Sequence, residues 1–380
     1  MRFVLKITCA ILAVLVLVWL VFRPSSAASG TTLAWRLQPD SFPVGAVLQG
    51  SRVEMSLGLF SGLKPAPFPA FLSGLPSPLR KAADWTVMQF RTTVAKLGLR
   101  VRVEAPAFLE IERTEIGLHS SQEPFVEISF RVKTDSLGDW KSNLVIHLTG
   151  RAYGNSTINL PVTGKVIGAT SSNSLAVLIT ETPYTCYSTG VGKDFEQLAA
   201  LNGRLSAQGM KVDFCRELPP SVSNCRAILL GESELAGLGP AQVDQVRKFV
   251  ARGGRLILAA NAFFVPTVPK ANTLLASYGL EIIDRDAGLA ITNSQVVSDV
   301  LTSGVKRVDF HRPSQIIVTD PAQGKLLVEA EDGQGGYVAI SRRPPRGDVI
   351  VVTQSLWWNW IQSDPAKADN LLLLENLLTR

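Results

Sequence analysis

The stretch RAILLGESELAGLGPAQVDQVRKFVARGGRLILAANAF, residues 226–263, predicts a strand, a helix and a second strand. Residues 227–230 form a short unbroken apolar run, which is typical of a strand covered on both faces. Pro240 then marks the start of a helix, and Gly253 marks its end. Residues 255–260 form the next apolar run, so the whole stretch indicates a right-handed βαβ unit with parallel strands.

Length and composition predict a folded protein with more than one core. The chain has 380 residues, of which 46% are hydrophobic and 18% are charged, and its formal net charge is +6. A chain of this length exceeds one ordinary core, so we expect two domains. The charge is not concentrated in any Lys/Arg block, which indicates a generally basic surface and no nucleic-acid partner.

The first residues have the pattern of a membrane segment. Two basic residues precede an apolar run over residues 7–22, and such a segment inserts with its basic end inside. Small residues near Ala28 would also suit cleavage of a signal peptide. The length of the run and Trp19 favour an uncleaved signal-anchor over residues 1–29. Under either interpretation residues 30–380 leave the cytoplasm, so we expect the membrane as a partner and an extracytoplasmic location in the cell envelope.

The cysteines allow one disulfide in an oxidising compartment. Cys186 and Cys215 are each expected to follow a strand end at the same sheet edge, which makes them the preferred pair. Cys215 with Cys225 is the alternative. The sequence holds no CxxC motif and no Cys/His cluster, so we expect no metal site.

Residues 45–168 predict an all-β domain. Apolar and polar residues alternate through several short runs, for example over residues 126–133, and turn residues separate the runs. Such a pattern indicates a β-sandwich. The run LVIHLTGRAYGNSTINLPVTGKVIG, residues 144–168, resembles Ig-like domains of the abnormal-spindle/hydin type.

The small residues 169–174 predict a linker, and residues 175–380 predict a second domain. Strands and helices alternate along its first half, as in the organising stretch. This alternation indicates an α/β domain with an open, parallel, flavodoxin-like sheet.

Two candidate sites follow from this fold. Ligands of open parallel sheets bind beyond the carboxyl ends of the strands. This rule nominates a pocket that contains Thr182, Tyr184, Glu232, Ser233, Asn261 and His311. Separately, Trp357, Trp358 and Trp360 form an aromatic cluster that suits a glycan or peptide platform, or a cover for the end of the sheet.

Residues 175–380 resemble the class I glutamine amidotransferase-like domains, in particular an envelope-associated subgroup without an assigned reaction. The segments GPAQVDQVRKFVARGGRLILAAN, residues 239–261, and SLWWNWIQSDPAKADNLLLLENLL, residues 355–378, carry the resemblance. It implies a cysteine nucleophile at the turn after residues 256–260. Asn261 and Ala262 stand at that turn, and neither can form a thioester.

We therefore expect no catalytic residue, no glutaminase activity and no cofactor. The sequence favours a non-enzymatic, membrane-tethered envelope protein that serves binding or assembly, with an envelope protein or a glycan as its partner. The alternative is a hydrolase or carbohydrate-active enzyme that uses the pocket at the strand ends. The oligomeric state is left open.

Overall fold

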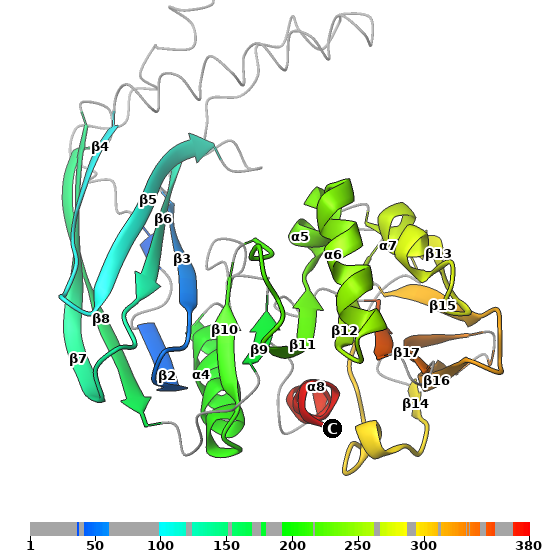
Figure 1. The fold of residues 1–380 in the computed structure, drawn as a ribbon. Helices are drawn as coiled ribbons and strands as arrows, with labels where there is room; N and C mark the ends of the chain where they lie inside the picture. Colours follow the sequence, from blue (N-terminus) through cyan, green and yellow to red (C-terminus); the bar gives the residue numbers. More distant parts are fainter. Residues whose placement is uncertain are drawn as a thin grey trace, which may run out of the picture.

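The computed structural model describes a mainly β protein in which most strands belong to one continuous sheet. The described residues are 36–37, 42–60, 99–118, 124–150, 154–168, 176–179, 192–215, 217–261, 267–286, 294–310, 313–331, 333, 335–342, 347–353 and 368–380. Their strands form one sheet of fourteen strands and one of four. Figure 1 shows the N-terminal strands at the left, the parallel strands in the centre and the C-terminal strands at the right.

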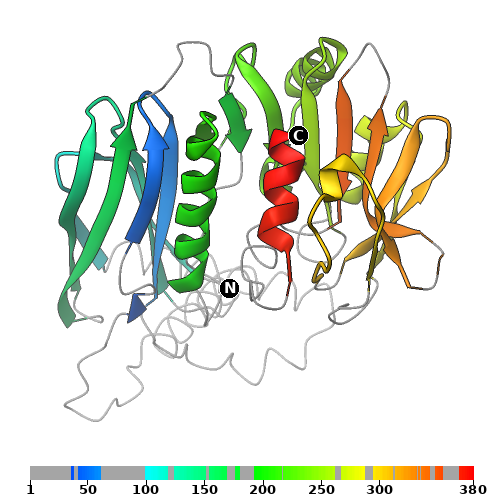
Figure 2. The same cartoon turned by 90° about the horizontal axis from the view of Figure 1, so that it is seen from below.

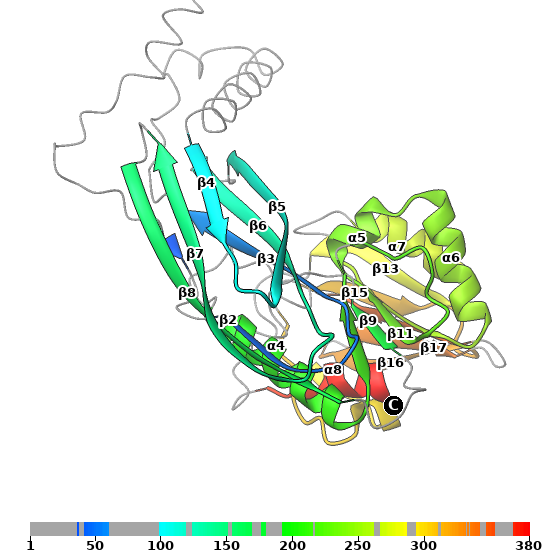
Figure 3. The same cartoon turned by 60° about the vertical axis from the view of Figure 1, so that its left-hand side comes forward.

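The first part of the chain forms two facing β layers. Its strands are β1 (Arg36–Leu37), β2 (Phe42–Leu48), β3 (Val53–Phe60), β4 (Leu99–Glu104), β5 (Leu109–Leu118), β6 (Pro124–Val132), β7 (Gly138–Gly150) and β8 (Gly154–Ile167). One layer has the order β2-β8-β7-β4, while β3, β6 and β5 belong to the large sheet. The predicted alternation holds in β6, where Val126, Ile128 and Phe130 are buried in the shared core. Figure 3 shows the two layers side by side.

The second part of the chain contains all the helices among the described residues. Its first elements are β9 (Ala176–Ile179), α4 (Gly192–Ala207), β10 (Lys211–Phe214), β11 (Cys225–Leu230), α5 (Glu232–Gly237), α6 (Pro240–Ala251), β12 (Arg255–Ala259) and α7 (Val268–Leu275). The remaining elements are β13 (Leu280–Asp286), β14 (Ser294–Val296), η1 (Val300–Thr302), β15 (Ser314–Val318), β16 (Gly324–Ala330), β17 (Gly336–Arg342), β18 (Asp348–Val352) and α8 (Asn370–Thr379).

The predicted βαβ unit is present. β11 and β12 pair in parallel, with Ala227 opposite Arg255, and α6 begins at Pro240 and ends at Ala251. Val246, Phe249 and Val250 form its buried side. The helix therefore lies where its apolar spacing and its bounding Pro and Gly residues predict it.

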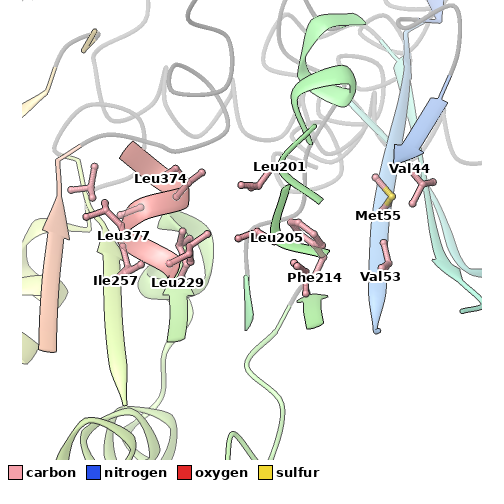
Figure 4. Packing of buried hydrophobic residues seen from close by; sticks show 14 of the residues in the cluster. Val44, Val53, Met55, Leu201, Leu205, Phe214, Leu229, Ile257, Leu374 and Leu377 are labelled. Atoms are coloured by element: carbon pink, nitrogen blue, oxygen red, sulfur yellow. The ribbon is translucent and has the colours of Figure 1, made fainter. Parts of the chain in front are cut away.

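Helices cover both faces of the parallel strands. Ile228 and Leu256 pack with α5, α6 and α7 in one apolar cluster. Their neighbours Leu229 and Ile257 point to the opposite face, where they pack with Leu374 and Leu377 of α8 (Figure 4). Figure 2 shows α4 and α8 on this second face. The alternation of side chains along each strand thus explains why both faces are apolar.

The expected fold class is wrong in the shape of the sheet. The strands β10, β9, β11, β12 and β18 are parallel, but β17, β15 and β13 extend the same sheet in antiparallel pairing. At its other side the sheet continues through β3, β6 and β5 of the N-terminal part. The result is a mixed sheet of parallel and antiparallel strands in a mainly β protein, instead of an open, parallel, flavodoxin-like α/β domain.

A seam of direct contacts joins the N-terminal and C-terminal parts. β10 pairs with β3 through Phe214 opposite Val53, and the Phe214 N–H donates to the Arg52 carbonyl at 2.7 Å. The N–H of Arg52 donates to the Asp213 carboxylate at 2.7 Å. A single apolar cluster extends from Val53 through Phe214 to α8 (Figure 4). The two parts therefore share one core.

The predicted membrane segment is not borne out by the structure. None of the helices among the described residues is long and apolar enough to cross a bilayer. Residues 1–29, on which the anchor was predicted, lie outside the described residues. The structure therefore gives no support to the membrane partner or to the extracytoplasmic location, both of which depended on this anchor.

Candidate functional site

The carboxyl ends of β11 and β12 bring part of the predicted pocket together, but its polar groups face inward. Glu232 follows β11 and is 4% exposed, and Asn261 follows β12 and is fully buried. The N–H of Asn261 donates to the Thr267 hydroxyl at 3.0 Å. That hydroxyl donates in turn to the Asn261 carbonyl at 3.3 Å. Asn261 thus fixes the start of α7 instead of lining an open cavity.

Glu234 lies two residues further along the same short helix and is also buried. Its carboxylate accepts a hydrogen bond from the Leu218 N–H at 2.9 Å. Burial raises the pKa of Glu234 above its usual value, the Leu218 hydrogen bond opposes this, and the nearby Glu217 charge adds to it. A carboxyl with a raised pKa is a feature of acid–base sites, although this one also holds the loop before β11 in place.

The other predicted site residues lie outside the description. Thr182, Tyr184, His311, the three Trp residues 357, 358 and 360, and Cys186 are not among the described residues. The side chain of Ser233 is not described either, although its backbone belongs to α5. The pocket with His311 and the aromatic platform therefore remain predictions, whereas Cys215 of the predicted Cys186–Cys215 disulfide is a free thiol in the structure.

Two thiols lie near the seam. Cys215 and Cys225 are both free, so the alternative disulfide between them is not formed. Burial raises the pKa of Cys215 to about 12, and the nearby Arg52 charge partly opposes this. Burial likewise raises the pKa of Cys225 to about 11. Thiols with such pKa values are protonated at neutral pH and are weak nucleophiles.

The outer side of α6 carries two adjoining grooves, which sequence reasoning missed. The first groove has a volume of about 950 Å³ and lies between α6 and α7. Its lining includes Ala236, Pro240, Val243, Arg247, Pro269 and Lys270. The second, of about 530 Å³, lies between α6 and the loop before β11, with Ser221, Ser223, Gln245, Lys248 and Arg252. Ala241 and Asp244 line both grooves. We call this continuous surface the α6 face.

Side chains of the α6 face are held in place by bonds to neighbouring backbone. Arg247 donates to the Thr273 carbonyl of α7 at 3.2 Å, and Lys270 donates to the Leu238 carbonyl at 2.8 Å. Gln245 donates to the Pro219 carbonyl at 2.7 Å. Lys248 pairs with Asp244 at 3.1 Å, one helical turn away. The position of α7 beside α6 creates the groove that Arg247 borders.

No cluster of His, Cys, Asp or Glu side chains that could hold a metal ion occurs within the described ranges. Glu232 and Glu234 are two acids on one short helix and do not form such a cluster. The described residues therefore form two candidate sites. One is a buried acidic corner at the strand ends, and the other is the open, basic α6 face.

Comparisons with known proteins do not assign the chain to a family. No protein-family model and no curated protein matches the sequence. Among solved structures, a human ASH/PapD-like domain (PapD-like domain 7 of CEP192) is 10% identical, with a TM-score of 0.22, over 36% of this chain and 88% of that domain. A protein of unknown function from Porphyromonas gingivalis W83 is 10% identical, with a TM-score of 0.21, over 38% of this chain and 52% of its own.

A secreted serine protease, VesC from Vibrio cholerae, is 11% identical, with a TM-score of 0.20, over 41% of this chain and 27% of the protease. Overlaps this small do not define a function. The resemblance to class I glutamine amidotransferase-like domains is wrong, because the strands form a mixed, mainly β sheet. The PapD-like domain matches 36% of this chain, which is a minority of it.

Proposed function

We propose that this protein is a non-enzymatic binding or assembly protein. The observation that carries the proposal is the contrast between its two candidate sites. At the strand ends, Glu234 and Asn261 are buried and bond to the protein's own backbone or to Thr267. On the α6 face, charged side chains border open grooves. Open grooves with polar borders are the usual form of a binding surface, whereas buried, internally bonded groups stabilise the fold.

The first part of the test is reconstitution with a partner. The full chain is purified from cells that express it, under conditions that preserve complexes, and any stoichiometric companion is identified by mass spectrometry. The companion is then purified separately and mixed with the full chain in a calorimeter. We expect a saturable complex with a dissociation constant in the range of about 1 mM to 1 nM that is usual for specific partners.

The rival function is a hydrolase or carbohydrate-active enzyme at the strand ends. One observation favours it, the raised pKa of the Glu234 carboxyl. The second part of the test is therefore turnover of a panel of chromogenic esters and glycosides by the full chain and by Glu234→Gln. Glutamine keeps an oxygen that accepts the Leu218 N–H, so the variant should fold. Turnover that Glu234→Gln abolishes would overturn the proposal, and equal background rates in both proteins support it.

A further inference from the structure

The α6 face has a pronounced excess of positive charge. Its lining holds four cations, Arg247, Lys248, Arg252 and Lys270, and one anion, Asp244. The anion lies at the junction of the grooves, since Asp244 lines both. A surface with this imbalance attracts an anionic partner and disfavours a cationic one.

The cations keep donors available after their internal bonds are made. An Arg guanidinium has five N–H donors and a Lys ammonium has three. Arg247 donates to the Thr273 carbonyl, and Lys270 donates to the Leu238 carbonyl. Each of these bonds uses one N–H of the charged head group, so other donors remain for a ligand. Arg252 is exposed at the end of α6, and Lys248 is 74% exposed beside Asp244.

The apolar part of the first groove shows which kind of anion fits. Ala236, Pro240, Val243 and Pro269 lie beside the cations. Small apolar surfaces interleaved with cations suit the alternating side chains of an extended peptide. Single-stranded nucleic acid is instead held on aromatic side chains, and the lining residues of both grooves include no aromatic side chain.

We propose that the α6 face binds an acidic, extended peptide segment of a partner protein. Carboxylates of the segment pair with Arg247 and Lys270 on one side of α6 and with Lys248 and Arg252 on the other. Its small apolar side chains lie against Val243 and Pro269. This inference rests on the proposed binding function and names the chemistry of the partner.

The test is fluorescence anisotropy with the full chain and a labelled peptide in which glutamates alternate with alanine and valine. The same peptide with lysine in place of glutamate is the reversed probe. We expect saturable binding of the acidic peptide only, weakening as salt is raised because the pairs are exposed to solvent. The double variant Arg247→Glu/Arg252→Glu should weaken binding by about tenfold or more.

Two matched variants decide whether the effect is local. Asp244→Asn removes the one anion of the lining and should tighten binding by about two- to fivefold. Arg100→Glu on β4, an exposed strand position far from α6 in the fold (Figure 1), makes the same charge change per site and should leave the affinity unaltered. Circular dichroism confirms that each variant is folded.

Three results would overturn the inference. The first is no binding of the acidic peptide at low salt, and the second is equal weakening by Arg100→Glu and by the α6 variants. The third is tighter binding of a polythymidine oligonucleotide that the α6 variants abolish, which would assign the surface to nucleic acid. The two proposals can fail separately. If a purified companion binds the α6 variants as well as it binds the original chain, the binding function stands although the α6 face is not the surface used.

Discussion

Asn202 of α4 donates a hydrogen bond from its Nδ2 to the backbone carbonyl of Val44 at 2.9 Å, and thereby ties the helix to β2 across 158 residues of sequence. Asn202 is fully buried. Ser206, one turn later, donates to the Ala46 carbonyl of the same strand at 3.1 Å. These bonds give a donor to carbonyls of β2 at the buried contact with α4.

Replacing Asn202 by alanine should destabilise the whole protein. The change leaves the buried Val44 carbonyl without this donor, so we expect a loss of about 1–3 kcal/mol in the free energy of unfolding. Urea unfolding followed by tryptophan fluorescence measures it. The control is Gly203→Ala at the next position, where a Cβ would meet no atom within 4 Å. That change should stabilise the helix by about 0.5–1 kcal/mol.

β2 approaches α4 closely at Gly45. Its φ is +79°, and a Cβ there would lie 2.6 Å from backbone atoms of Ala199. Gly45→Ala should therefore cost more than about 3 kcal/mol, because backbone strain and a backbone clash add together. Gly50→Ala is the matched control, since Gly50 has a φ of +75° and open space around it. Its cost should be about 1–2 kcal/mol, and equal losses for both variants would disprove the close packing of the seam.

Asp299 should give the protein an acid-sensitive ion cluster. Burial alone would raise the pKa of Asp299, but hydrogen bonds from Arg342, the Leu301 N–H and Lys325 hold it well below its usual range. Its side chain is 6% exposed, and Arg342 binds both carboxylate oxygens. A carboxyl with a lowered folded pKa adds stability above its unfolded pKa of about 3.9, and that stability is lost as the pH falls below it.

The measurement is the free energy of unfolding of the original chain and of Asp299→Asn from neutral pH downward. Above pH 5 we expect the free energy of unfolding of the variant to be about 2–4 kcal/mol lower than that of the original chain. This difference should narrow below about pH 3. Asp244→Asn, which removes an exposed pair one helical turn apart, should change stability by less than about 0.5 kcal/mol at every pH. A deficit that stays constant with pH would mean that the Asp299 charge contributes nothing.

The thiols Cys215 and Cys225 should resist alkylation until the protein unfolds. Their pKa values are raised to about 12 and about 11, so the reactive thiolate is scarce at pH 8. Iodoacetamide labelling at pH 8 should be at least about a hundredfold slower for Cys215 in the folded chain than in urea. Rapid labelling of Cys215 in the folded chain would contradict its burial.

The central elements were predictable because their signals are local. The buried run of β11, the Pro at the start of α6 and the glycines after it lie within one stretch, so periodicity and end signals sufficed. The antiparallel direction of the C-terminal strands was not predicted. Only residues 331–335 separate β16 from β17, and a parallel pair needs a crossover of a dozen or more residues. This connection length was an available signal for antiparallel pairing.

The seam and the α6 face had no local signal. β3 meets β10 through one registered pair, Val53 with Phe214, and nothing in either segment specifies a partner so distant in sequence. The rule for strand ends found Glu232 and Asn261 but could not show that both are buried. The grooves depend on where α7 packs beside α6, which is a tertiary property.

Photo-crosslinking of the full chain tests most directly whether the α6 face, and not the strand ends, is the binding surface. The probe is the acidic peptide with a photoreactive residue at its centre, and mass spectrometry locates the adducts. The account predicts adducts on residues 236–252 and 268–275, suppressed by excess unlabelled acidic peptide. Adducts concentrated on residues 231–234 and on Asn261, or spread without preference, would contradict it.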